Sequence, residues 1–231
     1  MNGKKVLLTG GTGGLGMGVT PLAAARGADL TVTYRHSEEV DRLKQKMAAE
    51  DFSKIQFVKI DLLDESAVKQ LIEDMGRIDG LIHLVGGFAM GATAEYSYEN
   101  WKKDFDLNLN TTFLTCKYSL AKMLKQGYGR IVTVGSRGAV EPGAKLAAYC
   151  ASKAAVVALT KSIAAETRGT NVTANCVLPS VIDTPANREA MGTEEAQKWV
   201  EPKSLAEAIC FLASEAAKDL RGAAVPVYGD V

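Results

Sequence analysis

Short apolar runs alternate with longer segments of helical spacing along the whole chain. The runs are rich in branched side chains and lie at residues 6–8, 30–33, 55–58, 81–84, 131–134, 172–177 and 225–227. Between them, apolar residues recur at helical spacing over 14–26, 37–50, 64–75, 97–125, 147–167 and 204–216. Strands that are apolar on both faces are typical of a parallel sheet. The pattern therefore predicts an α/β fold, a doubly wound parallel β-sheet with helices on both faces.

Residues with a preference for helix ends mark several of these boundaries. Asp64 precedes a helical segment as an N-cap would, Gly76 follows that segment, and Ser97 could cap the next helix. No repeat, low-complexity tract or linker interrupts the chain, so residues 1–231 are predicted to form one domain. The segment 183–203 lacks a clear strand, and we expect it to form a short substrate lid.

The charge of the chain is balanced, with 27 basic and 27 acidic residues. A nucleic-acid or anionic-membrane partner would require a basic surplus or cluster. The chain also contains no apolar run of transmembrane length, and its first residues lack the apolar core of a signal peptide. We therefore expect no nucleic-acid partner, no membrane partner and a cytoplasmic location.

The cysteines do not suggest a metal site. Cys116, Cys150, Cys176 and Cys210 form no CxxC pair, and the chain has only two histidines that could join them. We expect no bound metal. Each cysteine lies in an apolar stretch, which is typical of buried free thiols in a reducing compartment.

A glycine-rich turn at 9–16 directly follows the first apolar run and precedes a helical segment. It satisfies GxGxxG at Gly11, Gly13 and Gly16, and TGxxxGxG at Thr9, Gly10, Gly14 and Gly16. Glycines allow a backbone to approach a pyrophosphate closely, and the following helix directs its N-terminal amides towards it. A flexible turn would look similar, but the position between strand and helix favours dinucleotide binding.

The end of the second apolar run bears on the choice of cofactor. An acidic residue there would bind the ribose 2′-hydroxyl of NAD, but the chain has Tyr34-Arg35 instead. The planar donors of Arg35 could bind a 2′-phosphate. The sequence therefore favours NADP(H), with NAD(H) as the alternative; an exposed arginine at a strand end stays open as the other explanation of Arg35.

Tyr149 and Lys153 lie one helical turn apart, on the same face of a helical segment. A phenol has a pKa of about 10, so it is a poor proton donor at neutral pH. A cation one turn away would lower that pKa towards the working range. Ser136 ends the preceding apolar run, at the sheet edge where such folds bind ligands.

Together these motifs resemble those of the short-chain dehydrogenase/reductase family, in its common single-domain, Rossmann-type form. The matching residues are Thr9, Gly10, Gly14, Gly16, Asp61, Asn108, Ser136, Tyr149, Lys153, Asn175, Pro179 and Thr184. They occur in the family's order and spacing and cover nearly the whole chain.

The resemblance implies an NAD(P)-dependent oxidoreductase that interconverts a carbonyl and an alcohol by direct hydride transfer. Tyr149 would be the general acid/base, and Ser136 would hydrogen-bond the substrate oxygen. Lys153 would hold the nicotinamide ribose and lower the tyrosine pKa, and Asn108 would hold a water in a proton relay.

The resemblance also implies a set of cofactor-binding residues. Asp61 and Leu62 would contact the adenine, and Thr184 the carboxamide. The remaining cofactor residues would be Thr9, Gly10, Thr12, Gly14, Leu15, Gly16, Arg35, Val85 and Gly86, together with Tyr149 and Lys153.

Two segments depart from the family pattern. The usual Asn-Asn-Ala-Gly reads Leu84 to Gly87 here, which removes side-chain amides that normally link the central strands. The usual Pro-Gly reads Pro179-Ser180. With the short lid, these differences predict a small or open substrate pocket.

Three other side chains could serve the site or only the packing. His83 is expected to be a packed core histidine, and Arg137 an exposed loop residue. Trp199 in the lid is a candidate substrate contact, whereas Trp101 is explained equally well by helix packing.

Two other functions stay open at this point: a catalytically silent dinucleotide-binding sensor or scaffold, and an epimerase that retains its nicotinamide. The segments 97–125 and 147–167 have apolar residues on more than one face, and we expect a homodimer or homotetramer. The identity of the substrate does not follow from the sequence.

Overall fold

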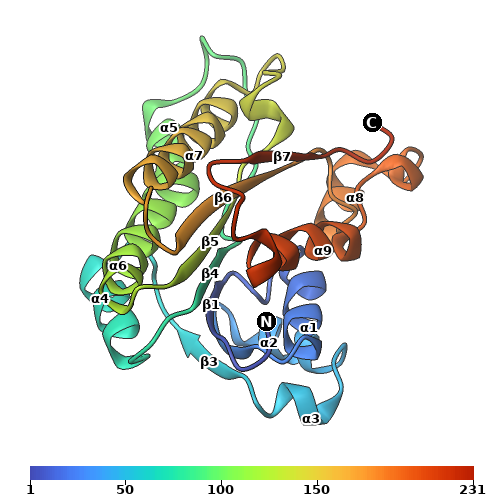
Figure 1. Cartoon of the computed structure of the whole chain (residues 1–231). Coiled ribbons are helices and arrows are strands. Elements are labelled where there is room, and N and C mark those ends of the chain that lie inside the picture. Colours follow the sequence, from blue (N-terminus) through green and yellow to red (C-terminus); the bar gives the residue numbers. More distant parts are fainter.

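The structure is a computed structural model that describes all 231 residues. A single sheet crosses the molecule, and all its strands run parallel in the order β3-β2-β1-β4-β5-β6-β7 (Figure 1). The strands are β1 Lys5–Thr9, β2 Asp29–Tyr34, β3 Gln56–Lys59, β4 Gly80–His83, β5 Gly129–Val134, β6 Val172–Pro179 and β7 Ala224–Val227. The predicted fold class is confirmed.

Helices cover both faces of this sheet (Figure 1). They are α1 Gly16–Ala25, α2 Ser37–Lys44, α3 Ala49–Phe52, α4 Glu65–Asp74, α5 Tyr98–Phe105, α6 Thr111–Gln126, α7 Ala147–Glu166, α8 Pro185–Met191 and α9 Pro202–Leu212. One core contains buried residues of α1 and α9, and the other contains those of α4, α6 and α7. No helix has the length and apolar character needed to cross a membrane.

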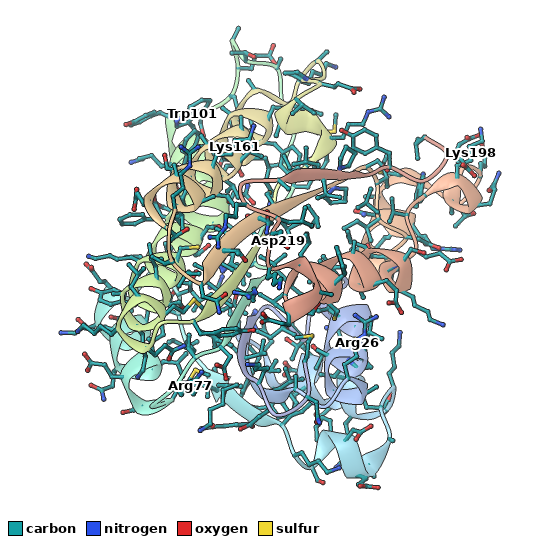
Figure 2. The ribbon with its side chains drawn as sticks, in the orientation of Figure 1. Arg26, Arg77, Trp101, Lys161, Lys198 and Asp219 are labelled. Atoms are coloured by element: carbon teal, nitrogen blue, oxygen red, sulfur yellow. The ribbon has the colours of Figure 1, made fainter.

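The central strands show why the sequence reads as continuous apolar runs. Val6 and Leu8 of β1 lie in the first core and Leu7 in the second, because successive side chains of a strand point to opposite faces. Side chains fill the space between the sheet and each helical layer (Figure 2). Burial on both faces therefore replaces the alternation of apolar and polar residues.

The predicted helix boundaries are largely confirmed, with two informative differences. The Asp64 carboxylate accepts a hydrogen bond from the Ala67 amide at 3.0 Å, and the Ser97 hydroxyl accepts one from the Asn100 amide at 3.1 Å. The segment 37–50, predicted as one helix, instead divides into α2 and α3. The break lets Met47 pack against the first core.

The second difference lies within 97–125, where α5 and α6 are separated by a π-helical turn at Asp106–Asn110. Such a turn inserts a residue into the helix and is frequent at functional sites. It carries Asn108, which is 1% exposed.

The topology places a crevice at one edge of the sheet. β1 pairs with β2 on one side and with β4 on the other, so the strand order reverses between them. In open parallel sheets, ligands bind outside the carboxyl ends of the strands at this reversal.

Candidate active site

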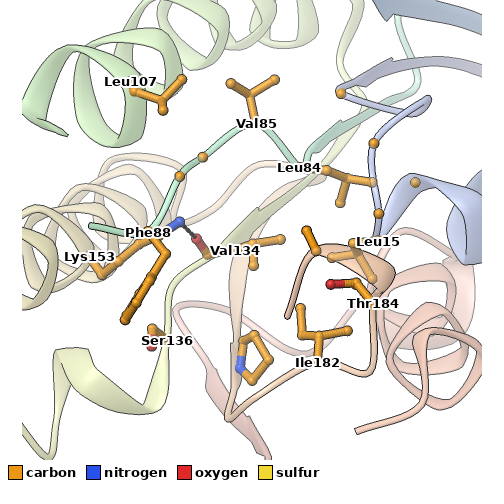
Figure 3. A pocket seen from close by; sticks show the side chains of 18 of the residues that line it. Leu15, Leu84, Val85, Phe88, Leu107, Val134, Ser136, Lys153, Ile182 and Thr184 are labelled. Carbon is orange, nitrogen blue, oxygen red and sulfur yellow. Dashed lines mark hydrogen bonds between the residues drawn. The ribbon is translucent and has the colours of Figure 1, made fainter. Parts of the chain in front are cut away.

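A cleft of about 1130 Å³ opens at this edge of the sheet (Figure 3). It is lined by most of the residues that the sequence singles out: Gly10, Thr12, Gly14, Leu15, Gly16, Arg35, Asp61, Leu62, Val85, Gly86, Ser136, Tyr149, Lys153 and Thr184. Thr9 and Asn108 do not line it. Both are buried behind its wall.

The glycine-rich turn is shaped by close contacts that exclude larger residues. A Cβ on Gly16 would overlap the backbone of Gly11, and one on Gly14 would lie 2.9 Å from Cγ2 of Thr184. Gly10 has a φ of +69°, which strongly favours glycine. A Cβ on Gly13, in contrast, would meet only the Gly10 carbonyl oxygen at 3.4 Å. A Cβ on Gly11 would also clash, because it would lie 2.4 Å from Cδ2 of Leu8. Of these glycines, only Gly13 has room for a side chain.

Two side chains of opposite charge face the end of the cleft next to β2. Arg35 is exposed, lines the cleft and forms no ion pair within the chain. Glu39, in the first turn of α2, also lines it and accepts a hydrogen bond from the Thr12 hydroxyl at 2.7 Å. Glu39 was not predicted from the sequence, because it lies in α2 and not at the end of β2, where the motif has its acidic residue.

The second end of the cleft brings Ser136, Tyr149 and Lys153 together. Ser136 follows β5 and is 7% exposed, and its hydroxyl accepts a hydrogen bond from the Gly138 amide at 3.1 Å. Lys153 is 5% exposed, and its Nζ donates to the Val134 carbonyl at 2.9 Å (dashed line in Figure 3). The two ends thus share one cavity.

Burial dominates the acid–base properties of this end of the cleft. It lowers the pKa of Lys153 to about 8, because a buried ammonium loses its hydration. It raises the pKa of Tyr149, and the Ser136 hydroxyl offsets part of that rise. Lys153 is not among the groups that shift the pKa of Tyr149, so the predicted lowering by Lys153 is wrong for this structure. Its ammonium is directed at Val134 instead.

Asn108 holds the loop after β4 against α7. Its Oδ1 accepts from the Gly87 amide at 2.9 Å, and its Nδ2 donates to the Ser152 hydroxyl at 3.1 Å. A Cβ on Gly86 would lie 2.8 Å from both Asn108 Oδ1 and Lys153 Nζ. The glycine at 86 is therefore required by the close packing of Asn108 and Lys153.

His83 forms a polar link between β1 and α6. Its Nδ1 lies 2.8 Å from the Thr9 hydroxyl of β1 and 3.0 Å from the Thr115 hydroxyl of α6. Burial lowers the pKa of His83 to about 3, so the ring is neutral at physiological pH. The prediction of a packed core histidine is confirmed.

The remaining side chains have structural contacts. Trp199 is 6% exposed and does not line the cleft, so the predicted substrate contact is wrong; the side chain is buried within the protein instead. Trp101 stacks on Phe105 with ring centroids 4.7 Å apart. Arg137 lines the cleft but pairs with Glu141 at 2.7 Å.

The four cysteines are free and buried, as predicted. Burial raises the pKa of Cys116 to about 12 and that of Cys210 to about 11, so neither thiol is reactive at neutral pH. No three His, Cys, Asp or Glu side chains are grouped as metal ligands would be.

Comparison with known proteins decides the family. A family model described as short chain dehydrogenase matches residues 4–195. The chain belongs to the short-chain dehydrogenase family. It is therefore an oxidoreductase, and the family's dehydrogenases and reductases interconvert carbonyls and alcohols with a nicotinamide dinucleotide.

Relatives of known activity match this chain along nearly its whole length. It is 32% identical to the acetoacetyl-CoA reductase of an Acinetobacter species, over 98% of this chain and 96% of that protein. It is 29% identical to the D-beta-hydroxybutyrate dehydrogenase of Cupriavidus necator, over 96% of this chain and 95% of that protein. A solved actinorhodin polyketide ketoreductase with NADPH is 28% identical and superposes with a TM-score of 0.89, over 98% of this chain and 96% of that one.

The buried ammonium of Lys153 should make the chain less stable at neutral pH. Its pKa falls from 10.5 in the free side chain to about 8 in the fold, so folding becomes more favourable as pH rises through this interval. Below pH 8, Lys153 is protonated in both the folded and the unfolded chain, so the whole free-energy cost of burying its ammonium lowers the stability. We expect Lys153→Met to raise the free energy of unfolding at pH 7 by about 2 kcal/mol, after allowance for the lost Val134 hydrogen bond.

Denaturant unfolding at pH 7 and at pH 10 measures this effect. Lys161→Met, an exposed position on the same helix (Figure 2), is the matched control and should change little. A Lys153→Met protein that is less stable than wild type at pH 7 contradicts the prediction.

Proposed function

We propose that the chain is an NADP(H)-dependent carbonyl reductase, acting in reverse as an alcohol dehydrogenase, with Tyr149 as general acid/base. One observation carries the proposal. A single cleft joins the glycine-rich turn and the unpaired Arg35 at one end to Ser136, Tyr149 and Lys153 at the other. A protein that only binds a dinucleotide would have no need of Ser136, Tyr149 and Lys153 at the other end.

The residues of the chain divide the work between binding and proton transfer. The bound cofactor supplies the hydride. Tyr149 would donate its phenolic proton to the carbonyl oxygen during reduction, and Ser136 would hydrogen-bond that oxygen as negative charge develops on it. Because burial raises the pKa of Tyr149, the phenol keeps its proton at neutral pH, which suits the direction of reduction.

Lys153 and Asn108 would support this transfer from behind the tyrosine. We propose that Lys153 binds the nicotinamide ribose and that Asn108 belongs to the proton relay. Asn108 holds Gly87 and Ser152, and Ser152 in turn donates to the Tyr149 carbonyl at 2.8 Å. These contacts link the relay residue to the backbone of the helix that carries Tyr149 and Lys153.

The cofactor would lie between the glycine-rich turn and the lid. The N-terminus of α1 at Gly16 would bind the pyrophosphate. Asp61 and Leu62 would contact the adenine and Thr184 the carboxamide. Thr9 would act indirectly, because its hydroxyl binds His83 and fixes the start of the turn.

Tyr149→Phe tests the proposed mechanism. The variant keeps the ring but loses the proton, so turnover of carbonyl substrates should fall at least about 100-fold. Its affinity for NADPH should stay within twofold of wild type. Steady-state kinetics and a fluorescence titration of NADPH measure the two effects.

Each other outcome has a defined meaning. Undiminished turnover by Tyr149→Phe contradicts the assignment of the general acid. Binding of NADPH with no turnover of any carbonyl by wild type favours a dinucleotide-binding sensor or scaffold. Turnover without net consumption of NADPH favours an epimerase.

Arg35 tests the preference for NADP(H). Charged hydrogen bonds to a 2′-phosphate contribute about 1.5–3 kcal/mol, so Arg35→Ala should weaken NADPH binding about 10- to 100-fold. NADH, which lacks this phosphate, should bind with nearly unchanged affinity. Arg42→Ala, an exposed arginine of α2 outside the cleft, is the control. Equal loss for both cofactors would show that Arg35 does not recognise the phosphate.

We also propose that the protein forms a homodimer or homotetramer through α6 and α7. Phe113 and Leu124 of α6 are 47% and 45% exposed, so the face of α6 that does not pack in the core has apolar surface in contact with solvent. Sedimentation velocity at micromolar concentration should show an oligomer, and Phe113→Asp should weaken it. A wild-type monomer would overturn the proposal.

A reducing, cytoplasmic environment is proposed from the thiols. All four cysteines are buried and unpaired. In a secreted protein, cysteines are commonly oxidised to disulfides during folding, so free thiols favour a reducing compartment.

A further inference from the structure

Phe88 is held at the catalytic end of the cleft by the loop that follows β4. The Gly87 amide before it donates to Asn108, and a Cβ on Gly87 would lie 2.5 Å from Cδ2 of Leu107. The backbone therefore passes close to the π-helical turn, and the position of residue 88 is fixed by these contacts.

The Phe88 ring packs edge-on against the Tyr149 ring, with centroids 5.0 Å apart and planes at 72°. The side chain is nevertheless 57% exposed, and it lines the cleft (Figure 3). An aromatic ring that contacts the proton donor on one side and leaves most of its surface open to a cavity is available to a ligand.

Other apolar side chains line the same cavity. They include Leu107, Leu146 and Met191 of α8, which is 56% exposed. A methionine adapts its shape to a ligand and makes favourable sulfur contacts with aromatic rings.

The charged side chains near Tyr149 are already paired. Lys103 lies 2.6 Å from Glu99, and Arg137 lies 2.7 Å from Glu141. Asp106 accepts a hydrogen bond from Asn110 at 2.7 Å. Lys153 is directed at Val134, so each of the cations named here already has a partner within the chain.

We propose that Phe88 is a specificity-determining residue that selects uncharged aryl ketones and aldehydes. The aromatic group of the substrate stacks on the Phe88 ring, and its carbonyl oxygen faces Tyr149 and Ser136. The carbonyl carbon gains a hydride from the reduced nicotinamide, and the oxygen gains the Tyr149 proton. The products are an aryl alcohol and the oxidised nicotinamide. This inference rests on the proposed carbonyl reduction.

Two ketones of similar size test the proposed selection. Acetophenone has a planar aromatic ring, whereas the ring of cyclohexyl methyl ketone is saturated and puckered. We expect wild type to favour acetophenone in kcat/KM, and Phe88→Leu to lower that value about tenfold, mainly through KM. The value for cyclohexyl methyl ketone should stay within twofold, and Phe88→Tyr should keep the preference. Phe211→Leu, an exposed phenylalanine outside the cleft, is the control.

Two results would overturn the inference. An equal loss for both ketones, with a shifted pH profile of kcat/KM, means that Phe88 only orients Tyr149. Preference of wild type for acetoacetate over acetophenone means that the substrate is anionic.

Calorimetric titration of acetophenone into the protein with NADP⁺, where no turnover occurs, separates this inference from the proposed function. Binding that Phe88→Leu weakens supports the inference even if no carbonyl is reduced. Absence of acetophenone binding to wild type overturns it. Reduction of carbonyls that is insensitive to residue 88 leaves the proposed function standing and removes the inference.

Discussion

The parallel direction of every strand is the constraint on which the site depends. Because all strands point the same way, the segments that leave their carboxyl ends meet at one edge of the sheet. The glycine-rich turn follows β1, Arg35 follows β2, Gly86 follows β4, Ser136 follows β5 and Thr184 follows β6. Residues as distant in the sequence as Gly10 and Thr184 therefore line one cleft, and a Cβ on Gly14 would lie 2.9 Å from Cγ2 of Thr184.

Close packing at this edge limits which residues can occupy it. Gly16 leaves no room for a side chain beside Gly11, and Gly86 leaves none between Asn108 and Lys153. The same packing removes water from Lys153 and lowers its pKa, which costs stability at neutral pH. A buried cation that weakens the fold is retained where its chemistry is used, as expected of a functional site.

Much of this arrangement could be predicted from the sequence. Strand positions followed from apolar runs that are buried on both faces, and the cleft residues followed from motifs that sit at strand ends. Thr9 and Asn108 were placed correctly in the fold, but the motifs did not show that their side chains face the core and support other residues.

Features that depend on contacts distant in sequence could not be predicted. Glu39 reaches the cleft because α2 begins soon after β2, and it lies outside the motif at the strand end. The separation of α2 from α3 reflects the packing of Met47, and the pKa of Tyr149 reflects burial by the whole cleft. The burial of Trp199 likewise depends on contacts that the local sequence does not show.

We propose that one cleft brings a nicotinamide and a carbonyl together for direct hydride transfer. The most direct test is a single turnover with NADPH that carries deuterium at the transferred position, with analysis of the alcohol by mass spectrometry. Direct transfer places one deuterium on the carbinol carbon, none of it exchanged with solvent. An alcohol whose new hydrogen comes from water, or a deuterium that stays with the cofactor, would contradict it.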